Sequence, residues 1–199
     1  MTALVNFFFK KAFICFFWVV VVSSVNLELV RAESRTSTND IELESLFSEL
    51  LRSQNALTAD KITLQIWEIW TNDAYLESSR YAMEQGIKLM NQGRLSAAEK
   101  LFSALILKEP NYIEAWNKRA TIRFMMGQTE TSLEDVFVVL SKEPKHFGAM
   151  SGLGLILMKE KDFDGALRAY KKVLQINPFS RDAIRLIPIL EQRVFGERI

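Results

Sequence analysis

The sequence predicts an all-α fold, a solenoid built from helical hairpins. Three tripeptides that end in proline recur with a spacing of 34 residues: Lys108-Glu109-Pro110, Lys142-Glu143-Pro144 and Ile176-Asn177-Pro178. Between them, small residues and aromatic or branched residues recur at fixed places, and apolar residues fall at helical spacing on both sides of short turns. A period of roughly 20 to 50 residues is the signature of stacked repeats that share a continuous core.

These landmarks divide the chain into three units, 79–112, 113–146 and 147–180. In each unit the proline ends the second helix, because it has no N–H to donate and its ring blocks the preceding turn. Glycine at the fifteenth place ends the first helix of two units, and Lys161 replaces it in the third. The other recurring places are the eighth (Gly86, Ala120, Gly154), the twentieth (Ala98, Ser132, Ala166) and the twenty-fourth (Phe102, Val136, Tyr170).

This pattern resembles the tetratricopeptide repeat family, of the exported bacterial type, over 79–180. The resemblance implies a right-handed solenoid of three tetratricopeptide repeats that binds another protein. The residues that carry it are Leu153, Gly154, Phe163, Ala166, Tyr170 and Pro178 in the third unit, Trp116, Gly127 and Pro144 in the second, and Gly86, Gly93, Ala98, Phe102 and Pro110 in the first.

The middle unit departs from the family at two places. Arg119 stands where the family usually has leucine, and Arg123 where it usually has an aromatic residue. We expect these two cations, one helical turn apart, to pair with Glu134 or Asp135 on the next helix. The alternative is a specific anion site.

The segments that flank the repeats are also helical by their apolar spacing. Upstream, 40–78 reads as an N-terminal helical hairpin with helices over 41–53 and about 59–70, the second capped by Thr58. The repeat landmarks do not continue there, so this hairpin is either a degenerate repeat or an unrelated cap. Downstream, 181–199 reads as the C-terminal capping helix that repeat arrays need, with Pro188 kinking it or delaying its regular part.

Residues 1–32 have the order of a secretory signal peptide. Lys10 and Lys11 precede an apolar stretch, and the segment ends in Val30-Arg31-Ala32, where we expect cleavage. The alternative is a retained membrane anchor, but the uncharged run of 12–27 is shorter than the roughly 18 to 20 residues that span a bilayer. With 33–39 as a linker, the sequence predicts a periplasmic or secreted protein, or in the alternative a membrane-anchored one.

The residue inventory favours binding over catalysis. Lys and Arg total 25 against 24 Asp and Glu, so the charge balance does not predict nucleic-acid binding. The single cysteine, Cys15, lies inside the signal segment, and the single histidine, His146, is expected to be a turn or helix-start residue. No metal, cofactor or catalytic constellation is predicted.

The resemblance places the first helix of each unit on the concave side of the solenoid. The lysine and asparagine set with which chaperone-binding relatives hold a C-terminal carboxylate is absent, since Met83 and Ile87 occupy its opening places. The remaining stripe is rich in methionine, which adapts to varied apolar partners. The predicted partner-binding groove comprises Met83, Ile87, Met90, Asn117, Thr121, Phe124, Met125, Leu155 and Met158.

Two functions follow from this surface. The favoured one is a non-enzymatic interaction module of the envelope or secreted space that receives an apolar or amphipathic segment, expected to be helical, of a partner protein. The alternative is a structural or assembly subunit of an envelope complex, with self-association as one form. A competing hypothesis for the groove is that the upstream hairpin folds back and fills it with Trp67 and Trp70.

Overall fold

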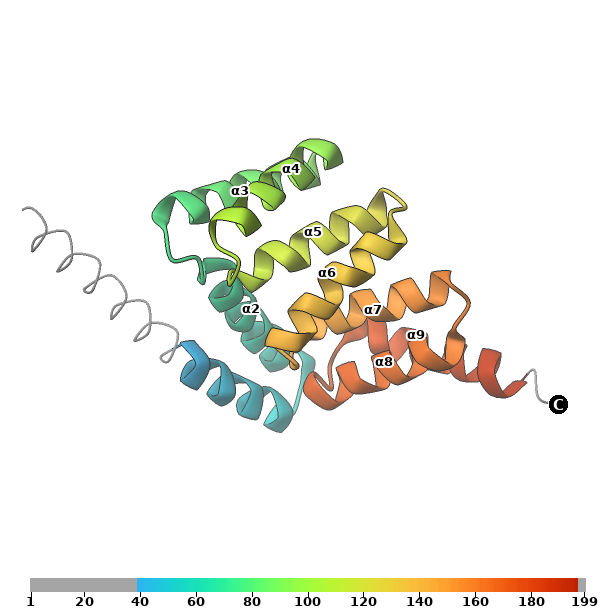
Figure 1. The fold of residues 1–199 in the computed structure, drawn as a ribbon. Coiled ribbons are helices and arrows are strands. Elements are labelled where there is room, and N and C mark those ends of the chain that lie inside the picture. The colour runs from blue at the N-terminus through green and yellow to red at the C-terminus, as the bar shows by residue number, and fades with distance from the viewer. Residues whose placement is uncertain (1–38, 197–199) are drawn as a thin grey trace, which may run out of the picture. The chain divides into compact units, whose positions relative to one another are not determined.

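Three helical hairpins follow one another in the computed structural model, which describes residues 39–196 (Figure 1). The chain divides into two compact units, one up to Ile41 and one from Glu42 onward, and the hairpins belong to the second. The predicted signal peptide, the linker up to residue 38 and the last three residues lie outside the described residues. Within the described part, no helix has the length and apolarity that a membrane crossing requires.

Each hairpin corresponds to one of the 34-residue units, except that the first helix begins at Glu77, two residues before its unit. The prediction of an all-α hairpin solenoid is confirmed. A further helix, α9 (Arg181–Phe195), packs against the last hairpin. It continues through Pro188, so its regular part is not delayed. The three hairpins are α3 (Glu77–Asn91) with α4 (Leu95–Lys108), α5 (Ile113–Met125) with α6 (Thr129–Lys142), and α7 (Phe147–Lys159) with α8 (Phe163–Ile176).

The hairpin turns share one backbone conformation. Gly93 and Gly127 have φ values of 72° and 82°, in the left-handed region that glycine adopts without steric cost. Lys161 adopts the same conformation with φ 62°, although it carries a side chain. The turn geometry is therefore kept in all three hairpins, at some cost in backbone strain in the third.

The glycine at the eighth place makes room for the aromatic ring of its own unit. A Cβ atom on Gly86 would lie 2.5 Å from the Phe102 ring, and one on Gly154 would lie 2.6 Å from the Tyr170 ring. The middle unit instead pairs the larger Ala120 with the smaller Val136, and both are buried. The middle unit thus fills the same space as the other two with a different division of volume between its two helices.

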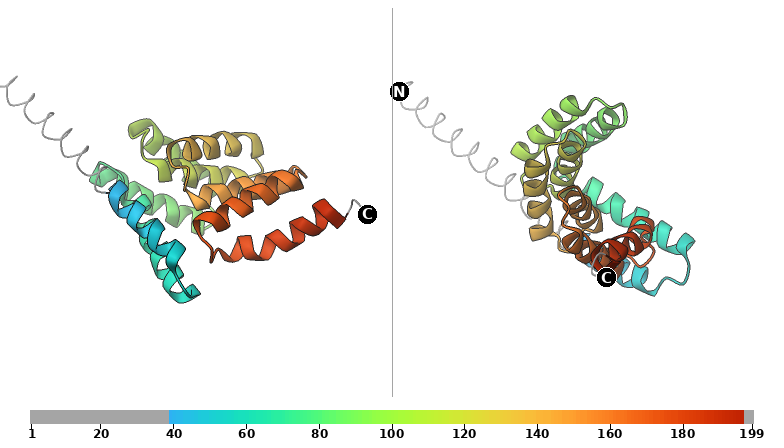
Figure 2. Two further views of the ribbon diagram at one scale, coloured as in Figure 1. Left: turned by 90° about the horizontal axis from the view of Figure 1, so that it is seen from below. Right: turned by 90° about the vertical axis from the view of Figure 1, so that its right-hand side faces the viewer.

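The N-terminal hairpin consists of a helix over 39–52 and α2 (Ala56–Asn72). Asn55 caps α2 by accepting a hydrogen bond from the Thr58 backbone, so the prediction that Thr58 is the cap is wrong. The two segments share one apolar cluster with α7, α8 and α9. In the right-hand view of Figure 2 the repeats form an arc and α2 lies on its open side.

Helix α2 does not stack on α3 as a further repeat. It follows the junctions between units instead: the Tyr112 hydroxyl donates to the Thr71 carbonyl, and Asn177 Nδ2 donates to Thr63 Oγ1 at 3.2 Å. At the same end, Arg181 forms an ion pair with Asp60. Of the two alternatives for this hairpin, these contacts favour an element unrelated to the repeats over a degenerate repeat.

Candidate partner-binding surface

The nine predicted groove residues do not form one open surface. Met83 is fully buried in a core cluster with Phe102 and Tyr112, so it cannot reach a partner. Asn117 is 6% exposed, and its amide donates to Glu114 Oε2 at 3.0 Å. These two residues belong to the interior.

Trp67 of α2 covers the beginning of this surface on α5 and α7. A Cβ atom on Gly148 would lie 2.4 Å from the Trp67 ring, so only glycine fits there without a shift. The Lys118 ammonium lies 4.9 Å from the centre of the same ring. Around Gly148 and Lys118, the contacts of Trp67 agree with the hypothesis that the upstream hairpin fills the groove.

Trp70 fixes α2 to the junction between the second and third units. Its ring stacks on His146 with centroids 3.9 Å apart and planes inclined by 13°. Phe147 lies 5.1 Å away from Trp70, and all three rings are buried. His146 caps the start of α7, as its place in the sequence predicts, because its Nδ1 accepts the Ala149 N–H at 3.0 Å.

A buried carboxylate lies beneath this aromatic stack. Since Nδ1 of His146 is an acceptor, its proton is on Nε2, which donates to Glu114 Oε2 at 3.1 Å. Lys118 forms an ion pair with the other oxygen at 2.7 Å. Burial raises the pKa of Glu114, but the His146 hydrogen bond and Lys118 outweigh it, so the pKa lies below its ordinary value of 4.5. This cluster was not predicted, because Glu114 and His146 are 32 residues apart in the sequence.

The later part of the predicted stripe is open, and we call it the open stripe: Thr121, Phe124, Met125, Leu155 and Met158. Met125 is 55% exposed and Leu155 is 42% exposed, both large apolar side chains. Phe124 is half-buried, and the Lys159 ammonium lies 5.5 Å from its ring centre. On α3, Ile87 and Met90 are half-buried against the core cluster that contains Met83. The accessible apolar surface thus lies on the second halves of α5 and α7.

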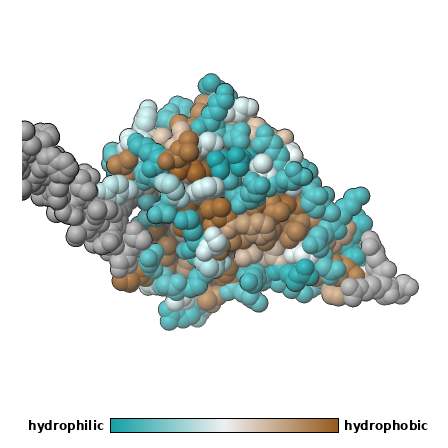
Figure 3. Space-filling model, viewed as in Figure 1, coloured by the Kyte–Doolittle hydropathy of each residue, from teal (hydrophilic) through white to brown (hydrophobic). Residues whose placement is uncertain are grey.

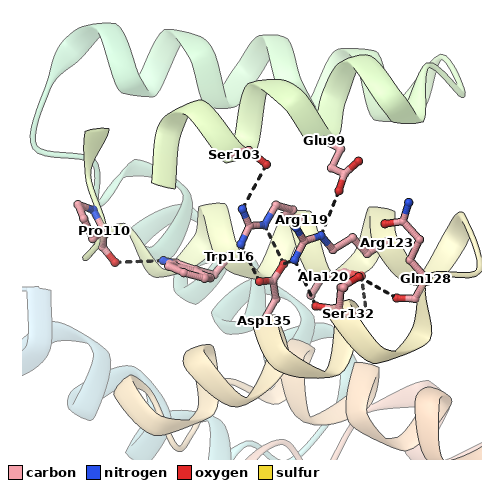
Figure 4. A network of polar contacts seen from close by, with 11 residues as sticks. Glu99, Ser103, Pro110, Trp116, Arg119, Ala120, Arg123, Gln128, Ser132 and Asp135 are labelled. Carbon is pink, nitrogen blue, oxygen red and sulfur yellow. Dashed lines mark hydrogen bonds and ion pairs between the residues drawn. The ribbon is translucent and has the colours of Figure 1, made fainter. Parts of the chain in front are cut away.

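The two unusual arginines form an internal network between α4, α5 and α6 (Figure 4). Arg119 donates from Nε and Nη2 to the two oxygens of Asp135, each at 2.8 Å. Arg123 bonds Asp135 at 3.0 Å and Glu99 at 3.1 Å. The predicted pairing is confirmed for Asp135, whereas Glu99 on the preceding unit was missed. Both guanidinium groups already have carboxylate partners, which leaves the anion-site alternative without support.

The part of the chain that the structure describes holds no metal-binding cluster. There, no three side chains of histidine, cysteine, aspartate or glutamate gather in a way that would hold a metal ion. The buried His146 and Glu114 are paired with each other beneath Trp70, and the buried Asp135 is paired with Arg119 and Arg123.

Comparison with known proteins places these features in a wider group. The tetratricopeptide repeat family profile matches residues 149–180. A TPR repeat-containing protein of Rhizobium etli is 32% identical over 170 residues, which cover 85% of this chain and 83% of that protein. Human DnaJ homolog subfamily C member 3 is 32% identical over 96 residues, but these cover only 19% of that protein.

Solved structures give the same fold. The Sgt2 TPR domain from Aspergillus fumigatus has a TM-score of 0.58 at 24% identity, covering 62% of this chain and 83% of that one. The first TPR of Spaghetti (RPAP3), bound to an HSP90 peptide, has a TM-score of 0.56 at 18% identity. The match covers 58% of this chain and 92% of that one. The crystal structure of MamA has a TM-score of 0.54 at 15% identity, and the match covers 78% of this chain and 82% of that one. At these identities the likeness concerns the fold alone.

Proposed function

Because the chain belongs to the tetratricopeptide repeat family, we propose that it is an interaction module of the cell envelope or secreted space. In this proposal it has no catalytic role, and the open stripe receives an apolar or amphipathic segment of a partner protein. The observation that carries it is the exposure of Met125 and Leu155 beside the half-buried Phe124 and Met158, on two neighbouring helices. Peptide binding by the RPAP3 domain supports a protein ligand.

The chemistry of the open stripe favours an apolar ligand over a terminal carboxylate. Met83 and Ile87 hold the places where a carboxylate clamp would begin, and Met83 is fully buried. Methionine side chains are flexible and polarisable, so Met125 and Met158 can repack around different apolar groups. Lys159, beside Phe124, supplies one cation at the margin. An amphipathic helix with its apolar side toward α5 and α7 fits this combination.

The proposed location rests on the sequence of residues 1–32 alone. We expect the exported protein to begin at Glu33, because Ala32 ends the small-residue cleavage pattern. N-terminal sequencing of the protein recovered from the envelope or medium checks this. An intact Met1 in the membrane fraction would instead support the anchored form.

The test of the open stripe is a double substitution, Met125→Glu with Leu155→Glu. Both side chains are substantially exposed, so the variant should keep its helix content and its Tm within a few degrees. Burying either new carboxylate against an apolar segment is costly, so the variant should lose the partner captured by the wild-type protein. The matched control is Leu64→Glu with Leu107→Glu, at side chains that are 67% and 85% exposed on other faces.

The outcomes separate the two candidate functions. Retention of every captured protein by the folded double variant would contradict binding at the open stripe. Loss of a larger complex in both the double variant and the control, with no segment held at the stripe, would favour the assembly subunit.

A further inference from the structure

A second apolar hollow lies on a different face, between α6 and α8 above α7. We call it the α6–α8 groove. Its volume is about 700 Å³, within the range of roughly 300 to 1,000 Å³ that ligand pockets occupy. Figure 3 shows apolar surface in the middle of this face. Its apolar lining consists of Phe137, Met150, Leu153, Leu157 and Ala169.

In the first and second units, the equivalent space lies between α4 and α6, and there the chain closes it. Leu153 and Leu157 hold the seventh and eleventh places of the third unit, where the second unit has Arg119 and Arg123. Those arginines reach Asp135, which stands at the twenty-third place on α6, and also Glu99 and Ser103 on α4 (Figure 4). They therefore join α4 to α6.

In the third unit the twenty-third place holds a small residue, Ala169, which lines the groove. Across the groove, Phe137 stands at the twenty-fifth place of the second unit and is 56% exposed. In the first unit that place holds Ser103, a small polar residue that provides no apolar wall. The same position in the fold is thus sealed by ion pairs in one unit and left open and apolar in the next.

The rim of the groove carries an excess of positive charge. Arg168, Lys171 and Lys172 line it, against the single carboxylate of Asp162. Asp162 accepts the Gly165 N–H as the cap of α8, and Lys171 pairs with Glu191. Within 39–196, neither Arg168 nor Lys172 makes an ion pair, and both are exposed.

From these observations we propose that the α6–α8 groove is a second docking surface, for a short acidic amphipathic segment of a partner protein. Apolar side chains of that segment lie on Leu153 and Leu157 beside Phe137, and its carboxylates lie against Arg168 and Lys172. Charge complementarity of this kind selects among partners and orients them. The surface is separate from the open stripe, so the two can be occupied by different segments.

The test uses the exported protein and two labelled synthetic peptides, read out by fluorescence anisotropy. Both are amphipathic helices of about four turns with leucine and phenylalanine on one side. One carries glutamates along its edges, and the other carries lysines at the same places. We expect the glutamate peptide to bind about tenfold more tightly or better, with an affinity that falls as salt rises.

Two variants locate the binding. Arg168→Glu with Lys172→Glu should weaken the glutamate peptide about tenfold, whereas Lys88→Glu with Lys100→Glu, at exposed lysines elsewhere, should leave it unchanged. Phe137→Ala should weaken it severalfold, and Leu107→Ala, at a more exposed apolar residue, should not. All four replace exposed side chains, and circular dichroism confirms that each is folded.

Four results would overturn the proposal. The first is no binding of the glutamate peptide up to about 1 mM, a weak affinity even for transient contacts. The second is equal binding of the two peptides, and the third is binding that survives the charge reversal at Arg168 and Lys172. The fourth is a concentration-dependent dimer that this reversal abolishes. The last result would make a second copy of the chain the occupant. Loss of binding in the Met125→Glu, Leu155→Glu variant alone would move the peptide to the open stripe, which keeps the two surfaces distinguishable.

Discussion

Glu114 is a fully buried carboxylate that joins three parts of the fold. It accepts from Asn117 on its own helix, pairs with Lys118, and accepts from His146, the N-cap of α7. His146 in turn stacks on Trp70 of α2. Removing one partner of such a cluster leaves a buried polar group without compensation, which costs more than the net worth of the pair.

The lowered pKa of Glu114 predicts how stability depends on pH. Its folded pKa lies below 4.5, so its ionised form stabilises the fold fully above that value, and the contribution is lost as pH falls through the folded pKa. We expect Glu114→Gln to destabilise the protein by about 2–4 kcal/mol near pH 7. The gap between wild type and variant should narrow below pH 4.5.

Urea unfolding of both proteins between pH 7 and pH 3 measures this gap. The comparison cancels the contributions that both proteins share. A gap that stays constant over the whole range would show that the ionised form of Glu114 contributes nothing.

At the scale of the element, α2 joins units that the solenoid otherwise connects only through neighbours. Its 17 residues extend about 25 Å at the rise of an α-helix, enough to pass several junctions. Thr71 meets Tyr112 at the first junction, Trp70 meets His146 at the second, and Thr63 meets Asn177 at the third. In simple solenoids stability is close to a sum of nearest-neighbour terms, so these contacts should raise cooperativity here.

Replacement of Trp70 tests this role of α2. Trp70→Ala should cost about 3–5 kcal/mol, because it empties a buried space against His146 and Phe147. Hydrogen exchange should then increase at the starts of both α5 and α7. Leu64→Ala, at a 67% exposed side chain of the same helix, is the control and should change stability by less than about 0.5 kcal/mol. Equal effects of the two substitutions would contradict the account.

The sequence predicted the repeating helices well and the placement of α2 poorly, for a physical reason. Proline and glycine report local needs of the backbone, such as the positive φ at Gly93 and Gly127, and these can be read without knowing the fold. The site of α2 depends on contacts between residues up to 121 apart, such as Asp60 with Arg181. Its apolar side chains would suit many surfaces equally well. For the same reason Met83 was assigned to the groove although it is core.

At the scale of the whole molecule, two faces gather accessible apolar side chains from adjacent helices, whereas others, such as Leu64 and Leu107, are exposed elsewhere. The open stripe lies on the first helices of the second and third units, and the α6–α8 groove lies between second helices. The N-terminal hairpin covers the beginning of the first surface but contributes no lining residue to the groove. The open stripe is therefore the place where we expect a partner segment to bind.

Site-specific photo-crosslinking in cells tests that claim most directly. A photoreactive residue placed at Met125 should form a crosslink to one partner protein, because this side chain of the open stripe is 55% exposed. The same residue placed at Leu107, which is 85% exposed on α4, should form none. Absence of any crosslink from Met125, or the same products from both positions, would contradict partner binding at the open stripe.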